Sequence, residues 1–406
     1  MATQAQALSF EPTSQMIKDA DQSLMHIVAR PEIVFVRGKG SYLWDAEDKR
    51  YLDFIQGWAV NYLGHSPAVL TRAIGRQAKQ LMNASPALYN QPMIELASTL
   101  TRHSALDKVF FANSGAEANE GALKLARKYG ARHLNGAYEV ITTWNSFHGR
   151  TLSMMSASGK AAWDGLFEPK VSGFTRVPFN DLKAMRKVVS NRTCAIMIEP
   201  VQGEGGVFVG KDAYLRGIRE LCNETGALMI LDEIQTGIGR TGSLFAYEQY
   251  GIEPDVMTLG KGLGGGFPVS ALQAKDKFCV FEAGDQGGTY CGQPLAMVAA
   301  QTVVSEMINR KIPAKVKARG RTLRRHLKMM AGEFGFTDIR GKGLLVGVDL
   351  PQDKGAQVVA EALKDGLLIN APRPNTLRFM PALTISNKEV EEMAEILRSV
   401  LKRVLG

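Results

Sequence analysis

Short runs of apolar and β-branched residues recur along the middle of the chain, separated by stretches with helical spacing. Runs of this kind are typical of strands in a mostly parallel sheet that is covered on both faces. The pattern therefore predicts an α/β fold in which strands and helices alternate. The expected strands are residues 108–112, 139–143, 194–199, 227–232, 255–260 and 268–274.

The two ends of the chain carry different patterns. Residues 31–54 predict a short antiparallel meander that is too small to fold alone, and we expect it to pack with the C-terminal part. After about residue 313, a long basic helix leads into an α+β arrangement. Its expected elements are a strand pair at 338–350, a helix near 356–365, short strands at 367–371 and 376–380, and a helix from about Lys388.

These patterns divide the chain into three parts. We expect residues 1–70 to form an N-terminal segment that packs with the small domain, residues 71–313 to form the large domain, and residues 314–406 to form the small domain. Near the first boundary, Ser66 is expected to be an N-cap and Pro67 the first residue of the next helix.

Composition excludes several classes of protein. The 406 residues are 45% hydrophobic and 22% charged, and a chain of this length buries a core without help from metals or disulfides. The four cysteines form no CxxC pair, which argues against a disulfide scaffold and a Cys-based metal site. The first fifteen residues contain no Lys, Arg or apolar run, and residues 286–305, the nearest approach to a membrane span, are too polar. We therefore expect a soluble cytoplasmic protein with no metal and no membrane contact.

The net charge of +9 raises the question of nucleic-acid binding. Residues 310–328 contain nine Lys or Arg and no acidic residue, and a basic strip of this kind can bind phosphates. Leu323, Leu327 and Met330 recur beside the charges at helical spacing, and no nucleic-acid motif accompanies them. We therefore favour a solvated helix face over a nucleic-acid site.

Two residues with useful chemistry follow expected strands. Asp232 ends the run ALMILD, and Lys261 follows the run DVMTLG. Open α/β sheets bind their ligands at the carboxyl edge of the parallel strands, so both side chains are expected there. Alone, the acid could be a helix cap and the lysine a solvated side chain, so the pair is more informative than either member.

The segment NSGAEANEGALKLARK (113–128) begins after a strand and continues as a strong helix. Backbone N–H groups at this helix start, together with the Ser114 hydroxyl, could bind a phosphate. The segment is equally consistent with an ordinary N-cap in which Glu117 completes a capping box.

The string LGKGLGGG (259–266) matches GxGxxG from Gly260 to Gly265. A dinucleotide site requires a helix after the third glycine, but here residues 267–268 lead into another expected strand. A nicotinamide-dependent dehydrogenase is therefore only a remote alternative.

Three further motifs stand out, SFHGRT (146–151), EPVQGEGG (199–206) and GGTYCGQPL (287–295), and the first two follow expected strands. Glu199 and Glu204, in the second motif, could serve as acid and base, although nothing in the sequence fixes their separation. His148 has no second His or Cys ligand nearby, so we expect it to pack or donate a hydrogen bond rather than bind a metal.

In this order and spacing, the motifs resemble those of the class III aminotransferases, which use pyridoxal phosphate. The resemblance runs from about residue 30 to the C-terminus and implies the type I fold of pyridoxal-phosphate-dependent transferases. The motifs that carry it are NSGAEA, FHGR, EPVQGEGG, LDEIQTGIGRTG, LGKGLGGGFP and GGTYCGQPL. Within the class, the bacterial acetylornithine/succinyldiaminopimelate branch is most similar, through KGSYLWD, YLDFIQGWAVNYLGH, GLFEP, FNDL, GGFPVSA and LRFMPAL.

The resemblance implies a role for each cofactor-site residue. Lys261 would hold pyridoxal phosphate as a Schiff base, and Asp232 would keep the pyridine nitrogen protonated. Backbone N–H groups of Gly115 and Ala116 would bind the phosphate, with Ser114 adjacent. The other implied cofactor contacts are Phe147 on the ring face, Gln235 at the ring oxygen, Glu233 and Ile234 beside Asp232, and Thr289 from the neighbouring subunit of a homodimer.

The resemblance also implies the substrate contacts. Arg150 would clamp the substrate α-carboxylate, a task suited to a planar cation that binds both oxygens. Glu204 and Arg378 match a pair that opens or closes a second carboxylate site, and Gly288 lies in the implied substrate-binding set. Trp58 occupies a position that is often smaller in the family, and we expect it near the substrate.

The implied reaction moves the terminal amino group of N2-acetylornithine to 2-oxoglutarate, giving N-acetylglutamate 5-semialdehyde and glutamate in arginine biosynthesis. Succinyl-diaminopimelate, from lysine biosynthesis, is a second implied substrate. Ornithine or 4-aminobutyrate aminotransferase would share every cofactor residue and stays an alternative.

Overall fold

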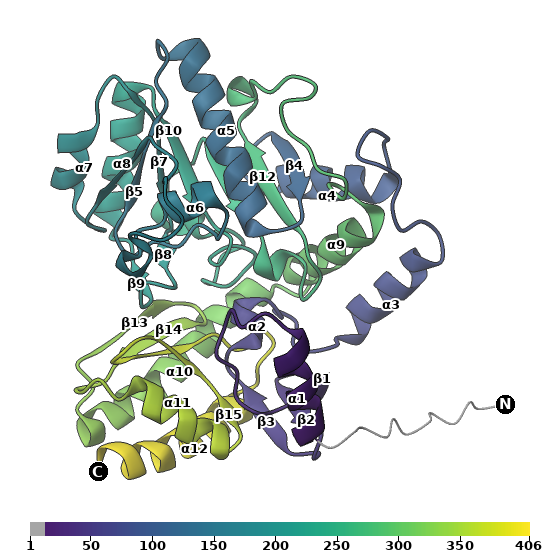
Figure 1. The fold of residues 1–406 in the computed structure, drawn as a ribbon, viewed down its shortest axis with the longest axis vertical. Coiled ribbons are helices and arrows are strands. Elements are labelled where there is room, and N and C mark those ends of the chain that lie inside the picture. Colours follow the sequence, from purple (N-terminus) through teal and green to yellow (C-terminus); the bar gives the residue numbers. More distant parts are fainter. Residues whose placement is uncertain (1–12) are drawn as a thin grey trace.

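The computed structural model describes residues 13–406 and has two parts of unequal size (Figure 1). The larger part contains a seven-stranded sheet with the order β4-β12-β11-β10-β7-β5-β6. Neighbouring strands are parallel except at β12, which is antiparallel to both β4 and β11. These strands are β4 (Lys108–Ala112), β5 (Glu139–Thr143), β6 (Phe174–Val177), β7 (Thr193–Ile198), β10 (Leu228–Asp232), β11 (Val256–Leu259) and β12 (Ser270–Ala274).

This sheet confirms the predicted α/β fold, because each of the six predicted apolar runs overlaps one of its strands. The central strands β7 and β10 are buried along their whole length, as a parallel strand covered on both faces should be. The pattern missed β6, an edge strand that is buried only in part and has no continuous apolar run.

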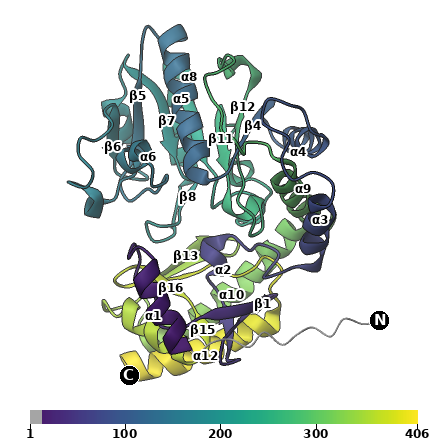
Figure 2. The same ribbon diagram turned by 45° about the vertical axis from the view of Figure 1, so that its right-hand side comes forward.

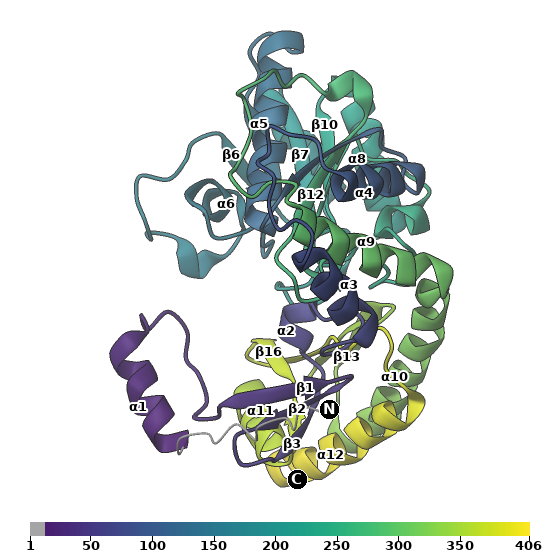
Figure 3. The ribbon, with the colours of Figure 1, turned by 90° about the vertical axis from the view of Figure 1, so that its right-hand side faces the viewer.

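Helices cover both faces of the large sheet. Figure 3 shows α5 (Gly115–His133) on one face and α8 (Asp212–Thr225) on the other. The shorter helices α6 (Leu152–Ala157) and α7 (Leu182–Val188) pack beside α5 and α8 respectively. Three more helices lie near the β4 edge: α3 (Ala68–Ala78), α4 (Gln91–Arg102) and α9 (Pro294–Asn309). Helix α9 contacts both α3 and α4.

The smaller part joins the two ends of the chain. Strand β3 pairs in parallel with β15, so the N-terminal meander and a C-terminal strand form one sheet, β1-β2-β3-β15. Its strands are β1 (Phe35–Lys39), β2 (Tyr42–Asp45), β3 (Arg50–Asp53) and β15 (Leu367–Leu368). This pairing supports a division of the chain in which the N-terminal segment packs with the small domain; residues 1–12 of that segment lie outside the described residues.

A second sheet and three helices complete the smaller part (Figure 2). The sheet has the order β13-β14-β17-β16 and is antiparallel throughout. Its strands are β13 (Asp338–Lys342), β14 (Leu345–Asp349), β16 (Asn370–Arg373) and β17 (Thr376–Phe379), and the helices are α10 (Ile312–Phe334), α11 (Gly355–Lys364) and α12 (Asn387–Leu405). In α10, Leu323, Leu327 and Met330 are buried, as expected for the apolar side of a helix whose basic side faces solvent.

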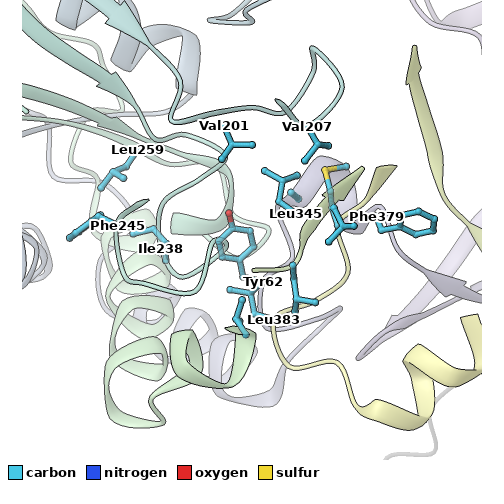
Figure 4. Close-up of a cluster of buried hydrophobic side chains, with 14 of the residues drawn as sticks. Tyr62, Val201, Val207, Ile238, Phe245, Leu259, Leu345, Phe379 and Leu383 are labelled. Carbon is cyan, nitrogen blue, oxygen red and sulfur yellow. The ribbon is translucent and has the colours of Figure 1, made fainter. Parts of the chain in front are cut away.

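Tyr62 and Arg240 connect the two parts. Figure 4 shows Tyr62 among buried apolar side chains contributed by both parts. Its ring lies 4.4 Å beneath the guanidinium carbon of Arg240, and its hydroxyl donates to the carbonyl of Gln235 at 2.9 Å. Arg240 itself donates through Nη1 to the carbonyls of Leu344 (3.0 Å) and Pro381 (2.7 Å) in the small domain. The carboxyl edge of the large sheet is thereby fixed against the small domain.

One predicted helix start is wrong. Ser66 has φ of 47° and makes no cap, whereas Pro67 is the N-cap of α3, which begins at Ala68. A left-handed serine immediately before Pro67 turns the chain, so its hydroxyl does not meet the first free N–H groups of the helix.

The remaining elements are short. They are the helices α1 (Thr13–Ser23) and α2 (Gln56–Ala59), the hairpin β8 (Val201–Gln202) and β9 (Phe208–Val209), and single 3-10 turns at Ala161–Trp163, Ala246–Tyr250, Lys261–Leu263 and Asp276–Phe278. Within residues 13–406, no helix is both long and apolar enough to cross a membrane.

Candidate active site

A cavity of about 270 Å³ lies at the carboxyl edge of the large sheet, where the sequence places Asp232 and Lys261. It brings together eight of the fourteen predicted site residues. These are Gly115, Ala116, Phe147, Arg150, Asp232, Ile234, Gln235 and Lys261. Its other lining residues are His148, Gly149, Glu199, Val201 and Thr236.

Asp232, at the end of β10, is held by three hydrogen bonds. Its Oδ2 accepts from Asn119 Nδ2 and from His148 Nδ1, both at 2.8 Å, and its Oδ1 accepts from the backbone N–H of Ile234 at 3.1 Å. Asn119 is held in turn by the hydroxyl of Thr258, which donates to its Oδ1 at 2.7 Å. The carboxylate therefore has one fixed orientation at the cavity wall.

His148 is fully buried beside Asp232. Burial lowers the pKa of the imidazole, but the hydrogen bond and the negative charge of Asp232 outweigh burial and leave the pKa raised. The sequence analysis expects His148 to pack or to make a hydrogen bond, and the structure shows a hydrogen bond to Asp232. Among the described residues, no group of His, Cys, Asp and Glu is arranged to hold a metal ion.

Lys261 follows β11 and begins a 3-10 turn. Its φ of 44° lies in the left-handed region, which is unfavourable for a residue with a side chain. Burial lowers the pKa of the amine, and the opposing charges of Glu204 and Asp232 only partly restore it. A larger fraction of this amine is therefore neutral, and so nucleophilic or basic, than in a solvated lysine.

The start of α5 is a capped helix terminus and also forms part of the cavity wall. The Ser114 hydroxyl accepts from the N–H of Glu117 (3.3 Å), and the Glu117 carboxylate accepts from the N–H of Ser114 (2.8 Å), which completes a capping box. Ser114 itself does not line the cavity, but the next two residues, Gly115 and Ala116, do. Their N–H groups lie in the first turn of the helix, where backbone donors attract anions.

Gln235 has an unsatisfied side chain. Its Oε1 and Nε2 are both buried and have no hydrogen-bond partner among residues 13–406. A buried amide without partners is costly, so this side chain fits a ligand that supplies a polar atom. The absence of a side chain at Gly203 makes room for it, because a Cβ there would lie 1.5 Å from Gln235 Oε1.

Phe147 and Arg150, which line the cavity, lie beside the ring of Trp163. Phe147 and Trp163 lie with their ring centroids 5.7 Å apart. The guanidinium carbon of Arg150 is 6.0 Å from the Phe147 centroid and 5.4 Å from the Trp163 centroid. Arg150 is otherwise exposed and makes no ion pair within residues 13–406, so it is free to bind a carboxylate.

Glu204 and Arg378 form a second charged feature close to the cavity. Arg378 Nη1 lies 2.7 Å from Glu204 Oε1, and the arginine side chain is fully buried on β17. Burial raises the pKa of Glu204, but the charges of Arg378 and Lys261 outweigh burial and leave the pKa lowered. The sequence prediction that these two residues pair agrees with this geometry.

Trp58 lies beside Arg378 of this pair. Residues 56–59 have φ values from 51° to 67°, so they form a left-handed turn. This turn places the indole ring 5.7 Å from the guanidinium carbon of Arg378, with half of the Trp58 side chain exposed.

Four other predicted residues do not line the cavity of this chain. Glu233 is buried and accepts from the N–H groups of Ala246 (2.6 Å) and Tyr247 (2.8 Å), which is a structural role. Gly288 and Thr289 lie in an exposed loop before α9. Ser114 caps α5, as described above.

Sequence reasoning missed three residues around the site. Asn119 and Thr258 fix Asp232, yet nothing in an isolated Asn within a helix or an isolated Thr within a strand signals this contact. Lys160 lies with Nζ 4.0 Å from Glu204 Oε2. Its position twelve residues after His148, beyond an intervening helix, gave no hint of that proximity.

Comparisons with known proteins show the family of the chain. The sequence profile of the family Aminotransferase class-III matches residues 26–401. An acetylornithine aminotransferase of Ralstonia nicotianae is 52% identical over 388 residues, which is 94% of this chain and 97% of that protein. One from Caldanaerobacter subterraneus is 44% identical, with 96% and 100% covered.

Solved structures give the same result. The ornithine aminotransferase of Toxoplasma gondii superimposes with a TM-score of 0.94 at 30% identity, covering 98% of this chain and 96% of that one. The acetylornithine aminotransferase of Elizabethkingia anophelis gives 0.86 at 30% identity, with 97% and 100% covered. With a family match over nearly its whole length and relatives above 50% identity, this chain belongs to the class III aminotransferases.

Proposed function

We propose that this protein transfers the terminal amino group of N2-acetylornithine to 2-oxoglutarate, giving N-acetylglutamate 5-semialdehyde and glutamate. One observation carries the proposal: a buried lysine, a fixed carboxylate and Arg150 line a single cavity, and a second arginine, Arg378, is paired with Glu204 close to it. The lysine and carboxylate suit transamination, and the two arginines suit substrates that carry carboxylates. The names of the most similar relatives support acetylornithine as the amino donor.

The cavity fits pyridoxal phosphate, the cofactor of this family. The unsatisfied amide of Gln235 suits the ring oxygen, and the first turn of α5 suits the phosphate. Phe147 presents a ring face, and Asp232 presents an oriented carboxylate for a protonated ring nitrogen. When bound, the cofactor supplies an electron sink that stabilises negative charge on the substrate carbon.

Two residues would carry out the proton chemistry. Lys261 Nζ would hold the cofactor and, once displaced by the substrate amine, move a proton on the substrate carbon as a general base and acid. The lowered pKa of this amine favours the basic form that accepts the proton. Asp232, oriented by Asn119 and His148, would keep the proton on the ring nitrogen.

Arg150 and Arg378 would bind the two substrates in opposite directions. Acetylornithine presents its terminal amine to the chemistry, so its α-carboxylate extends away toward Arg150. The α-keto carbon of 2-oxoglutarate must take the same place, which puts its α-carboxylate near Arg378. Glu204 would neutralise Arg378 during the first half-reaction and leave it during the second, because an unpaired Arg378 would attract the wrong carboxylate.

The working unit would be a homodimer. The family resemblance assigns Thr289 to the phosphate site of the neighbouring subunit, and the exposure of the loop that carries Thr289 and Gly288 is compatible with that assignment. The expected location is the cytoplasm, where both substrates of amino-acid biosynthesis are available.

Turnover on matched amino donors tests the proposal. With 2-oxoglutarate as acceptor, kcat/KM is expected to be at least about tenfold higher for N2-acetylornithine than for ornithine or 4-aminobutyrate. A higher value for ornithine would favour ornithine aminotransferase, the function of several structural neighbours. Comparison with N-succinyl-diaminopimelate would establish whether the enzyme also accepts the longer acyl substrate.

A further inference from the structure

Lys160 and Arg378 each approach a different oxygen of the Glu204 carboxylate. Its Nζ is 4.0 Å from Glu204 Oε2, whereas Arg378 Nη1 is 2.7 Å from Glu204 Oε1. The two oxygens of one carboxylate therefore face two different cations. Arg378 holds the closer contact, and Lys160 lies just beyond hydrogen-bond distance.

Aromatic rings hold Lys160 in this place. Its Nζ is 4.9 Å from the centroid of Phe147 and 5.3 Å from that of Trp163, both within the range of a cation–π contact. Only 28% of the Lys160 side chain is exposed, so water solvates its ammonium group incompletely and a nearby carboxylate stabilises it. Burial lowers the pKa of the amine, and the nearby charge of Glu204 opposes that lowering.

Positive charge dominates this side of the cavity. Lys160 and Arg378 approach the carboxylate of Glu204, whose pKa is lowered, and Arg150 lies over the same Trp163 ring as Lys160. The next acid, Glu199, is buried, and its pKa is raised to about 7, so it is only partly ionised at neutral pH. A substrate with two carboxylates suits such a surface, provided that Glu204 keeps a partner when a substrate carboxylate takes Arg378.

We propose that Lys160 is a positioning residue that receives the Glu204 carboxylate when a dicarboxylic acceptor binds Arg378. This inference rests on the proposed function, in which Glu204 leaves Arg378 during the second half-reaction. A carboxylate that left Arg378 with no second cation would be a poorly solvated, unpaired charge, which is strongly unfavourable. A short approach toward Lys160 exchanges one ion pair for another.

Binding of glutarate, a five-carbon dicarboxylate that cannot react, tests the exchange on the intact holoenzyme. Lys160→Gln is expected to raise the glutarate dissociation constant about tenfold, and Lys160→Arg, which keeps the charge, to restore it to within about twofold of wild type. In single-turnover spectra, Lys160→Gln is expected to slow amino transfer to 2-oxoglutarate at least about fivefold more than transfer from acetylornithine.

The same substitution in a Glu204→Gln variant distinguishes the proposed role of Lys160 from direct contact between Lys160 and the ligand. In Glu204→Gln no displaced charge needs a partner, so adding Lys160→Gln is expected to change glutarate affinity less than about twofold. A tenfold loss in both backgrounds would mean that Lys160 contacts the ligand itself, and this would overturn the proposal. Unchanged affinity in Lys160→Gln alone would overturn it as well.

Lys170→Gln is the matched control for disturbance of the loop. Lys170 donates to the carbonyl of Trp163 at 2.9 Å and so anchors the same segment without approaching Glu204. It is expected to bind glutarate as wild type does, and a loss equal to that of Lys160→Gln would assign the effect to the loop. If the wild-type enzyme neither bound glutarate nor aminated 2-oxoglutarate, the proposed function would be overturned. If the wild-type enzyme aminated 2-oxoglutarate normally and Lys160→Gln showed no selective loss of that half-reaction, this inference alone would be overturned.

Discussion

Nδ1 of His148 donates to Oδ2 of Asp232 across 2.8 Å, and both side chains are almost completely buried. The carboxylate raises the pKa of the imidazole against the opposing effect of burial. This contact ties the FHGR segment to the end of β10. It orients an acid that lines the same cavity as Lys261.

Loss of this contact is expected to weaken catalysis without unfolding the protein. His148→Leu should lower kcat about 10- to 100-fold, since a hydrogen bond to a charged group is typically worth that much. His148→Gln, which keeps a donor, should lose less. Steady-state kinetics on saturated holoenzyme measure both, and wild-type kcat in His148→Leu would show that the contact has no catalytic role.

Glu199 is expected to make stability fall as pH rises. Burial raises the pKa of this acid from its ordinary value of 4.5 to about 7 in the folded protein. The folded state therefore binds more protons than the unfolded state between these values, so the stabilising contribution is complete below pH 4.5 and lost as pH rises through 7. Between pH 5 and 8, Tm of wild type should fall by roughly 2–4 °C relative to Glu199→Gln. Parallel Tm profiles for the two proteins would contradict the raised pKa.

Gly203→Ala is expected to disable Gln235 by steric contact. A Cβ at Gly203 would occupy the place of Gln235 Oε1, and the amide must then leave the cavity. The loss in kcat/KM should be about tenfold and match that of Gln235→Ala, and the double variant should lose no more than either single variant. Gly332→Ala is the control, because a Cβ there meets nothing within 4 Å. Additive losses would mean that Gly203 acts independently of Gln235.

The fold was largely predictable because buried strands leave continuous apolar runs, and β4 and β5 have the predicted bounds. The carboxyl-edge rule placed Asp232 and Lys261 correctly for the same reason: Asp232 ends a buried strand and Lys261 closely follows another. The contacts of Asn119 with Asp232 and of Lys160 with Glu204 were not predictable. They join residues 113 and 44 positions apart in sequence, and only the folded chain brings them together. Glu233 shows the converse: it is adjacent to Asp232 in sequence, yet its carboxylate accepts from the N–H groups of Ala246 and Tyr247 and does not line the cavity.

Thr289 is expected to act in the neighbouring subunit. A Lys261→Ala chain and a Thr289→Glu chain should each be inactive alone, the second because a carboxylate repels the phosphate. After subunit exchange, heterodimers contain one site with both residues intact, so roughly a quarter of wild-type activity should return with random pairing. Verified heterodimers without activity would contradict a shared site.

Borohydride reduction followed by peptide mapping tests the central claim that Lys261 carries the cofactor and the chemistry. Reduction of the wild-type holoenzyme should convert the link between a lysine amine and the cofactor aldehyde carbon into a stable secondary amine. The account predicts that mass spectrometry finds this modification on Lys261, and that Lys261→Ala retains its fold but loses at least about 1,000-fold in kcat. Modification at another lysine, or a loss of tenfold or less in Lys261→Ala, would contradict the account.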